Sequence, residues 1–430
     1  MLIEENKPLA PFTTFQIGGP ARWFAQATSE EEIAEATAWA AERSVPLFVL
    51  GGGSNLLVSD AGFNGLVLRV ALRGITALPA AKQLEPLKAA GEVKAAGEVK
   101  GAGFSPYANQ AEATRALATE GGSSEASTVR PSSSTGSGAA AASDQPGQRI
   151  YRVAAGEDWE HFVQRAVDDA CAGVECLAGI PGTVGGTPVQ NVGAYGQEVA
   201  SAIERVRAFD LRERAFVEFS AAECGFSYRR SRFNSADRGC YAVTRVDYRL
   251  TRGGAPTIRY ADLQRALAAR QAEGRELSLA EVAEVVRGLR QSKGMLLVEG
   301  DPDCRSAGSF FKNPVVGEEQ LQRIAAVSQK APPRFPAGPQ PENLDRVKIP
   351  AAWLIEKAGF TKGYRLGAAA VSSRHTLALV NLGDCGGSGG HDERRGASAA
   401  EILALAGKII AAVEARFGLH LEMEPVMVGF

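Results

Sequence analysis

The chain has 430 residues, of which 45% are apolar, and its formal net charge is −2. This length predicts two or three domains, and this composition is sufficient for a sizeable buried core. A charge so close to zero gives no electrostatic footprint for nucleic acid or for an anionic membrane surface. If the protein binds phosphates, individual residues must do so.

The first residues lack the basic start and apolar core of a signal peptide, and no segment reaches the length of a membrane span. The six cysteines are scattered and form no C-x-x-C pair, and the four histidines lie far apart. Neither a disulfide framework nor a metal site is indicated. We therefore expect a cytoplasmic, metal-free protein. We also expect a monomer, although no residue pattern indicates the oligomeric state.

Two strands flank a glycine-rich loop near the start of the chain. Ser29 and Glu32 form a capping box, which predicts a helix that ends near Ser44. The apolar run 47–50 is typical of a buried strand, and GGGSNLLVSD follows it at Gly51–Asp60. A Rossmann site would place a helix directly after its glycines, but here two further strands follow, so that fingerprint is excluded. A phosphate-binding loop is still possible because successive N–H groups can bind an anion; the alternative is a hairpin turn.

Residues 78–148 differ in composition from their surroundings. The hexapeptide AAGEVK occurs twice in tandem at 89–100, and sequence rich in Ser, Ala and Gly follows it. Large apolar residues are too sparse to offset the entropy of ordering, so we predict a disordered insertion. A second polar, glycine-rich loop insertion is expected at 385–398.

The longest glycine-rich stretch is GIPGTVGGTPVQNVGAYG, at 179–196. It follows a predicted strand at Tyr151–Ala154 and a helix whose apolar positions recur from Trp159 to Ala170. The stretch has no charged side chain and includes several apolar ones, which favours a packed loop around a phosphate-bearing ligand over a surface loop.

The remaining elements are intermixed. Residues 203–250 alternate apolar and polar side chains, which predicts antiparallel strands. Ser278 with Glu281, and Ser398 with Glu401, are capping boxes for two further helices. A strand is expected near 376–381. Helices and strands do not alternate strictly, so the predicted class is α+β.

The glycine-rich stretch resembles the flavin-binding segment of the UDP-N-acetylenolpyruvoylglucosamine reductases, flavoenzymes of bacterial cell-wall precursor synthesis. The loop at 51–55 is similar to their G-x-G-S-N pattern, which holds the flavin pyrophosphate. No histidine lies in either loop, so the resemblance implies non-covalent FAD. The implied cofactor-binding residues are Gly51, Gly53, Ser54, Asn55, Gly179, Gly182, Gly185, Gly186, Asn191, Gly193 and Ala194.

The segment SAGSFFKNP, at 306–314, resembles the catalytic-serine motif of this family. Its Ser309 is implied to donate a proton to the carbon beside the substrate carboxylate. No nucleophile elbow surrounds this serine, so a hydrolase triad is not supported, and a simple turn serine is the alternative. Lys312 and Asn313 are candidate substrate contacts.

Tyr228 and Arg229 match the family's Y-R-x-S pattern within FSYRRSRF. A guanidinium can hold a carboxylate through two parallel hydrogen bonds, and the enolpyruvyl group carries a carboxylate. Arg230 and Arg232 are rival choices, and an arginine that is merely salt-bridged or solvated is the alternative. Tyr228 is the implied substrate contact beside the arginine.

Glu424 stands at the position of the family's C-terminal catalytic glutamate. Glu422 is its rival, because it would project from the same face of a strand, and a solvated glutamate is the alternative. Tyr260 and Lys293 stand where the longer form of the family contacts the substrate. The presence of Tyr260 favours that longer form.

The resemblance implies a two-part FAD-binding domain of the p-cresol methylhydroxylase/vanillyl-alcohol oxidase type and a smaller α+β substrate-binding domain. The expected divisions are 1–76 with 424–430, then 77–300, then 301–423. The implied reaction is the NADPH-dependent reduction of UDP-N-acetylglucosamine enolpyruvate to UDP-N-acetylmuramate through FAD. Alternatives are another FAD-dependent oxidoreductase of the same fold, such as an alcohol or sugar oxidase, and a non-enzymatic nucleotide-binding module.

Overall fold

The structure is a computed structural model that describes residues 1–78, 147–272, 274–337, 345–383 and 396–430. The predicted insertion at 78–148 lies outside the described residues except at its two ends. The same is true of the predicted loop at 385–398, of which only the last residues are described.

The N-terminal part is a four-stranded sheet with one helix. Strands β1 (Ile3–Pro8), β2 (Pro20–Ala27), β5 (Phe63–Val70) and β3 (Leu47–Leu50) lie in that order, and only the β1–β2 pair is antiparallel. Helix α1 (Glu30–Glu42) begins after Ser29, whose side chain accepts a hydrogen bond from the Glu32 amide. The strand–loop–strand order, with β4 (Leu56–Val58) after the glycines, is confirmed. The Ser29 half of the predicted capping box is confirmed as well, but the Glu32 carboxylate accepts from the Thr28 amide, so the reciprocal half is not formed.

The C-terminal end of the chain returns to this part of the molecule. Strand β20 (Val426–Val428) pairs in parallel with β4. The Val426 amide also donates to the carbonyl of Asn55, in the first glycine loop. Residues that lie some 370 positions apart in the chain are thereby held side by side.

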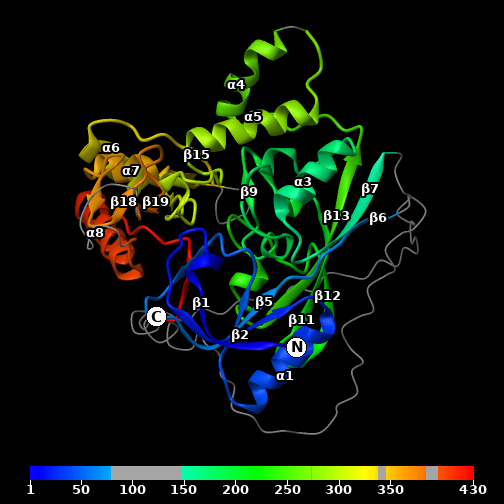
Figure 1. The fold of residues 1–430 in the computed structure, drawn as a ribbon. Coiled ribbons are helices and arrows are strands. Elements are labelled where there is room, and N and C mark those ends of the chain that lie inside the picture. Colours follow the sequence, from blue (N-terminus) through cyan, green and yellow to red (C-terminus); the bar gives the residue numbers. More distant parts are fainter. Residues whose placement is uncertain (79–146, 273, 338–344, 384–395) are drawn as a thin grey trace, which may run out of the picture.

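A larger antiparallel sheet occupies the right-hand side of the molecule in Figure 1. Its strands are ordered β12 (Ala215–Ser220), β11 (Ile203–Asp210), β13 (Tyr241–Arg252), β7 (Gln148–Ala154) and β6 (Ile75–Leu78), with β8 (Cys171–Ala172) also paired to β13. The predicted strands of 203–250 are therefore confirmed. Helix α3 (Trp159–Asp168) packs on the sheet through Trp159 and Phe162, and ends two residues before Ala170, which has φ of +54°.

A helical hairpin follows the sheet and projects from the top of the molecule in Figure 1. It consists of α4 (Ala261–Gln271) and α5 (Leu279–Ser292). The capping box of Ser278 and Glu281 at the start of α5 is confirmed. Helix α4 has no clear signal in the sequence, because only Leu263 and Leu267 of this helix are buried and its apolar stripe is weak.

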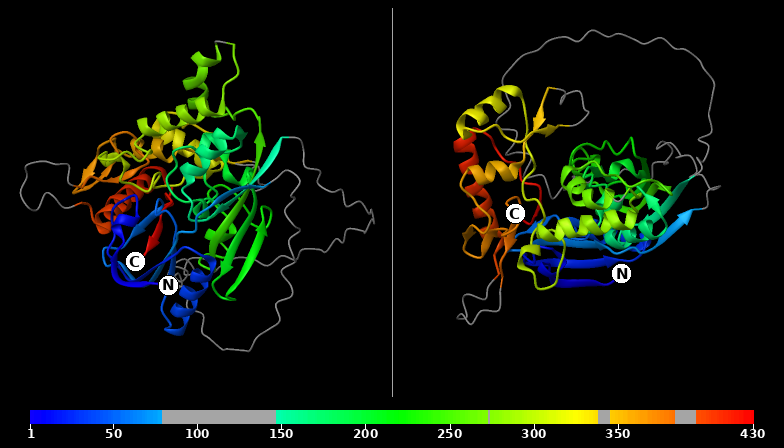
Figure 2. Two further views of the ribbon diagram at one scale, coloured as in Figure 1. Left: turned by 45° about the vertical axis from the view of Figure 1, so that its right-hand side comes forward. Right: turned by 90° about the horizontal axis from the view of Figure 1, so that it is seen from above.

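The third part lies to one side of both sheets in Figure 1 and Figure 2. Helices α6 (Glu318–Ser328), α7 (Ala351–Lys357) and α8 (Ala399–Phe417) share one core with two small sheets. The first sheet has the order β14 (Val315–Val316), β16 (Val347–Lys348), β15 (Phe335–Pro336). The second has the order β17 (Arg365–Leu366), β18 (Ala369–Val371), β19 (Leu379–Asn381). The capping box of Ser398 and Glu401 is confirmed, and the expected strand near 376–381 is shorter than predicted. The predicted domain boundaries stay a prediction.

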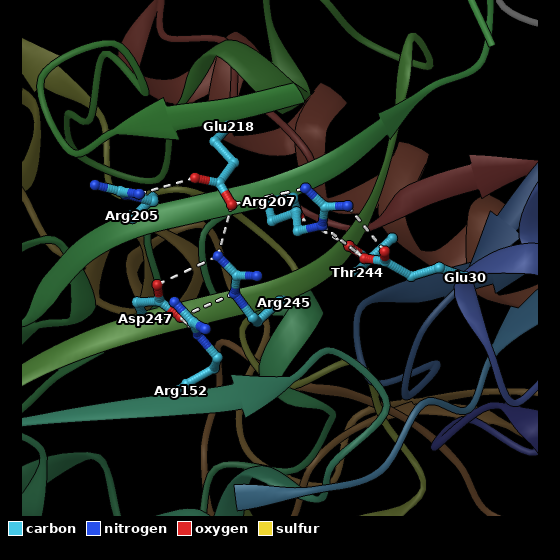
Figure 3. Close-up of polar contacts among 8 residues, drawn as sticks. All are labelled: Glu30, Arg152, Arg205, Arg207, Glu218, Thr244, Arg245 and Asp247. Atoms are coloured by element: carbon cyan, nitrogen blue, oxygen red, sulfur yellow. Dashed lines mark hydrogen bonds and ion pairs between the residues drawn. The ribbon is translucent and has the colours of Figure 1, made fainter. Parts of the chain in front are cut away.

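Charged side chains lie across one face of the larger sheet (Figure 3). Asp247 has no exposed side-chain surface and pairs with two arginines of the sheet. Glu30, at the start of α1, accepts two hydrogen bonds from Arg207 of β11, at 2.8 and 3.0 Å, and one from Thr244 of β13. This network joins the N-terminal part to the larger sheet; its members are Glu30, Arg152, Arg205, Arg207, Glu218, Thr244, Arg245 and Asp247.

Candidate active site

A cavity of about 870 Å³ lies where the three parts of the molecule meet. This volume is in the upper part of the range for small-molecule and cofactor sites. Both glycine loops, the helical hairpin, the third part and the C-terminal segment contribute to its lining. The predicted site residues that line it are Gly51, Gly53, Ser54, Asn55, Gly182, Gly185, Gly186, Gly193, Ala194, Tyr228, Arg229, Tyr260, Lys293, Ser309, Asn313 and Glu424.

The two glycine loops contact each other through their main chains. A Cβ atom on Gly52 would lie 2.5 Å from the Gly182 Cα. Gly53 has φ of +64°, and a Cβ there would lie only 1.8 Å from the Phe12 carbonyl oxygen. Larger residues cannot occupy these positions without moving the backbone. Glycine is therefore needed at 52 for the approach of the two loops, and at 53 for the approach of the first loop to the segment around Phe12.

The loops differ in the use of their amides. In the second loop, the amides of Val184, Gly185 and Gly186 donate to protein carbonyls at 2.8–3.0 Å. In the first loop, no amide of residues 51–55 donates to any acceptor among the described residues. The first loop, whose residues line the cavity, therefore has a run of amides without an acceptor among the described residues, as an anion-binding nest requires.

Cationic side chains outnumber acidic ones in the cavity lining. The acids are Glu198 and Glu424, whereas the cations are Arg229, Arg238, Arg290, Lys293 and Lys348. The cavity is therefore cationic although the chain carries a formal charge of −2. Anionic ligands such as phosphates and carboxylates fit this lining.

Arg290 is a buried cation of α5 that the sequence analysis did not single out. Its guanidinium donates to the carbonyls of Gly179 and Met295 and forms no ion pair with an acid of the described residues. Burial lowers the pKa of Arg290 to about 10. The sequence did contain a signal for this burial. Arg290 stands four residues after Val286, so it lies on the apolar face of the helix, where a charge is unusual.

Arg229 and Glu424 form an ion pair at the cavity. The Arg229 Nε lies 3.2 Å from the Glu424 Oε1, outside hydrogen-bond geometry, and its Nη1 donates to the Gly193 carbonyl at 3.0 Å. Burial raises the pKa of Glu424, although the positive charges of Arg229 and Lys312 oppose this effect. The rivals Arg230 and Arg232 do not line the cavity, and Arg232 pairs instead with Asp237.

The serine motif runs antiparallel to the C-terminal segment. The Glu424 amide donates to the Phe310 carbonyl at 2.9 Å, and the Lys312 amide donates to the Glu422 carbonyl at 2.9 Å. This pairing places Ser309 and Glu424 at the same cavity. Gly308, with φ of +71°, makes the turn that leads to the serine.

The two rival glutamates have different surroundings. The Glu422 side chain is 69% exposed and pairs with Lys312, whereas that of Glu424 is 10% exposed. Residues 422–424 form one isolated bridge and no strand, so the strand expected to carry both glutamates is not formed. Neither Glu422 nor Lys312 lines the cavity.

Asn313 connects the serine motif to the tyrosine of the Y-R-x-S pattern. Its Oδ1 accepts from the Ala351 amide at 2.9 Å, at the start of α7, and its Nδ2 donates to the Tyr228 hydroxyl at 3.4 Å. The Lys348 Nζ lies 4.3 Å above the Tyr228 ring. Burial raises the pKa of Tyr228 and lowers that of Lys348.

Tyr260 and Lys293 border the cavity from the helical hairpin. The Tyr260 ring is edge-on to the Tyr195 ring, with centroids 5.6 Å apart, and 38% of the residue is exposed. The Lys293 Nζ donates to Asp262 at 3.1 Å, and Asp262 lies two residues after Tyr260. The tyrosine and the lysine are therefore held near each other by α4.

Gly179 and Asn191 were predicted to bind the cofactor but do not line the cavity. The Gly179 carbonyl holds Arg290, and its amide donates to Glu160. The buried Asn191 side chain binds Glu198 and the main chain at two points. Both residues therefore hold the second loop in place through hydrogen bonds to other parts of the chain.

Further lining residues had no usable signal in the sequence. They include Thr183, whose buried Oγ1 has no hydrogen-bond partner among the described residues, as well as Gln190 and His375. Burial lowers the pKa of His375 to about 4. Within the described ranges, there is no group of three His, Cys, Asp or Glu residues that could hold a metal, and no helix that could span a membrane.

Comparison with protein families gives two matches. Residues 301–390 match the C-terminal domain of UDP-N-acetylenolpyruvoylglucosamine reductase, and residues 21–145 and 142–212 match the FAD binding domain. The UDP-N-acetylenolpyruvoylglucosamine reductase of Thermobifida fusca is 40% identical over 432 residues, which cover 99% of this chain and 97% of that protein. The enzyme of that name from Streptomyces coelicolor is 39% identical, with coverage of 99% and 90%.

The fold also agrees with a solved structure. The crystal structure of the UDP-N-acetylenolpyruvylglucosamine reductase from Thermus caldophilus matches 99% of this chain, with a TM-score of 0.53 and 23% identity. The predicted α+β class and FAD-binding domain are thus confirmed. The chain belongs to the UDP-N-acetylenolpyruvoylglucosamine reductases, a family of FAD-dependent oxidoreductases.

Proposed function

We propose that this chain reduces UDP-N-acetylglucosamine enolpyruvate to UDP-N-acetylmuramate with electrons from NADPH, a step of peptidoglycan precursor synthesis. One observation carries the proposal: in a member of this family, Ser309, Arg229 and Glu424 line the same cavity as both glycine loops. Family membership speaks against the alternatives, an alcohol or sugar oxidase and a non-enzymatic module. We further propose that the enzyme acts in the cytoplasm as a monomer.

The residues present fit FAD. The free amides of residues 51–55 and the cationic lining suit the pyrophosphate of the cofactor. A Cβ on Gly186 would meet no atom within 4 Å, so this part of the second loop leaves room for a ligand against its backbone. The unpartnered Thr183 Oγ1 is a further polar atom that a ligand could satisfy after a side-chain rotation.

When bound, FAD supplies the hydride chemistry, with NADPH as the electron donor. The protein has to orient the enolpyruvyl group and provide a proton. Arg229 would hold the substrate carboxylate, on which negative charge develops during the reduction. In the structure, this guanidinium pairs with Glu424.

The Ser309 hydroxyl would give its proton to the carbon beside the carboxylate. Glu424 lies at the same cavity, and its raised pKa lets it hold a proton closer to neutral pH than an exposed glutamate could. We assign Ser309 the role of acid toward the substrate carbon. Glu424 would place a protein carboxyl group beside the enolpyruvyl group, in addition to the carboxylate of the substrate itself. Substrate contacts would come from Tyr228, Asn313, Tyr260 and Lys293.

The test is NADPH oxidation by the purified, yellow protein. Consumption of NADPH should require the enolpyruvyl sugar nucleotide and should be absent with UDP-N-acetylglucosamine, which lacks the enolpyruvyl group. Acid denaturation should release all of the flavin. Equal NADPH consumption with the two sugar nucleotides would refute the proposed substrate, and flavin that stays on the denatured chain would refute non-covalent binding.

A further inference from the structure

Gln190, in the second glycine loop, lines the cavity beside the groups assigned above. Its Oε1 accepts a hydrogen bond from the Asn55 Nδ2 at 2.5 Å. The same Asn55 nitrogen donates to the main-chain carbonyl of Glu424 at 3.3 Å. One asparagine of the first loop therefore contacts both the second loop and the segment that bears the catalytic glutamate.

The directions of these hydrogen bonds follow from elementary chemistry. The main-chain carbonyl of Glu424 can only accept, so the Asn55 atom beside it must be the nitrogen. Both protons of that nitrogen are then used, one for Glu424 and one for Gln190. The Gln190 atom that faces Asn55 must be its oxygen, which leaves the Gln190 Nε2 as the free end of the amide.

The Glu424 main chain is held on both sides. Its amide donates to Phe310, next to Ser309, and its carbonyl accepts from Asn55. The Val426 amide donates to the Asn55 carbonyl. Asn55 cannot turn its amide without breaking the contact with Glu424, so the orientation of Gln190 is held by the catalytic segment.

We propose that Gln190 donates a hydrogen bond from Nε2 to the polar edge of the flavin ring and that Asn55 is the positioning residue that keeps this donor turned toward the cofactor. Among the described residues, the Nε2 has no protein acceptor. The inference rests on the proposed function, because the flavin ring must then lie next to the reacting groups Ser309, Arg229 and Glu424, where Gln190 is found. The pyrophosphate of FAD would bind at the free amides of the first loop, residues 51–55.

A donor at this edge favours the reduced cofactor. Reduction adds electron density to the carbonyl oxygens and ring nitrogens of a flavin, and a hydrogen bond to an electron-rich acceptor is stronger. Loss of the donor should therefore weaken binding of reduced FAD more than binding of oxidised FAD. A net hydrogen bond of about 0.5–1.5 kcal/mol corresponds to about a 2- to 12-fold change in affinity.

The test compares Gln190→Leu with wild type by FAD titration and by anaerobic redox titration with a reference dye. We expect the ratio of reduced to oxidised FAD affinity to fall by up to about 12-fold and the visible flavin band to shift. Gln190→Glu should behave like Gln190→Leu at high pH and recover toward wild type at low pH, because a protonated carboxyl group can donate. Gln26→Glu, on an exposed strand position, is the matched control and should change none of these values.

Asn55→Asp tests the positioning role. An aspartate accepts from Gln190 and turns its amide round, so this variant should reproduce the spectral shift of Gln190→Leu. Unchanged spectrum and affinity ratio in Gln190→Leu, or in a folded Asn55→Asp variant, would overturn the proposal. None of these readouts requires the sugar nucleotide, so a wild-type protein that binds FAD but does not turn over the substrate would refute the proposed function alone.

Discussion

Two glutamates near the C-terminus differ in their access to the cavity, and this difference gives a paired experiment. Glu424→Gln removes the carboxyl group beside Arg229, whereas Glu422→Gln removes an exposed one that pairs with Lys312. We expect Glu424→Gln to slow reoxidation of the reduced flavin by the enolpyruvyl substrate by about 10²–10⁴-fold, the usual contribution of a positioned acid or base. Glu422→Gln should stay near wild type, and the opposite ranking in stopped-flow traces would assign the role to Glu422.

His375 gives a prediction about pH. Burial, with help from Lys293 and Lys362, lowers the pKa of His375 to about 4, below its ordinary value of 6.5. The unfolded chain then binds a proton below pH 6.5 that the folded chain does not bind until about pH 4, so this residue makes the protein less stable as pH falls through that range. At pH 5 the loss amounts to roughly 1–2 kcal/mol.

The measurement is the thermal midpoint of wild type and of His375→Gln at pH 7 and pH 5. Between pH 7 and pH 5 both proteins lose stability through the titration of their other ionisable groups. The thermal midpoint of wild type should nevertheless fall further than that of the variant. Equal losses would show that His375 is not held neutral.

At the scale of elements, the contact between α1 and the larger sheet depends on Glu30. Burial alone would raise the pKa of Glu30, but the hydrogen bonds from Arg207 and Thr244 outweigh it, so the pKa lies below its ordinary value. The stabilisation is therefore present above the pKa of the unfolded chain and is lost as pH falls through the lower, folded value. Figure 3 shows that the glutamate reaches the sheet from a different part of the chain.

Glu30→Gln should lower the free energy of unfolding by about 1–3 kcal/mol at neutral pH, because it weakens a charge-assisted pair with Arg207. The control is Glu31→Gln, which also removes a charge from the first turn of α1 but lies on the exposed side. Chemical denaturation of both variants at pH 7 is the measurement. Equal destabilisation would attribute the effect to the helix terminus and not to the link between the two parts.

The sequence was sufficient to predict the helices whose first residues mark where the helix begins. The capped helices α1, α5 and α8 were predicted because Ser29, Ser278 and Ser398 each stand three residues before a glutamate. Helices α4 and α6 lack that signal: Tyr260 and Gly317 precede them and make no side-chain cap.

The same reasoning explains what was found and missed at the site. Motifs of several residues, such as the one around Ser309, could be recognised in sequence because their members are neighbours in the chain. The contacts of Asn55 with Gln190 and Glu424 join residues 135 and 369 positions apart, so only the fold brings them together. The separate surroundings of Glu422 and Glu424 depend equally on tertiary pairing with the serine motif.

At the scale of the whole molecule, residues 79–146 connect two strands that are already neighbours. Leu78 of β6 pairs with Ile150 of β7 in the antiparallel register of the larger sheet. A short turn can therefore replace this segment without changing the sheet, and loop length alone affects stability only weakly. We expect a variant with a turn in place of 79–146 to keep wild-type flavin content and turnover. A loss of either would show that the segment serves the core or the site.

The central claim is that Ser309 protonates the substrate, and its most direct test separates the two half-reactions in a stopped-flow spectrometer. Bleaching of the flavin by NADPH needs no proton for the sugar, whereas its reoxidation by the enolpyruvyl substrate does. Ser309→Ala should therefore bleach at the wild-type rate and reoxidise about 10²–10⁴-fold more slowly. If the variant slows both half-reactions equally, the serine supports the flavin or the geometry of the site, and its assignment as the acid is wrong.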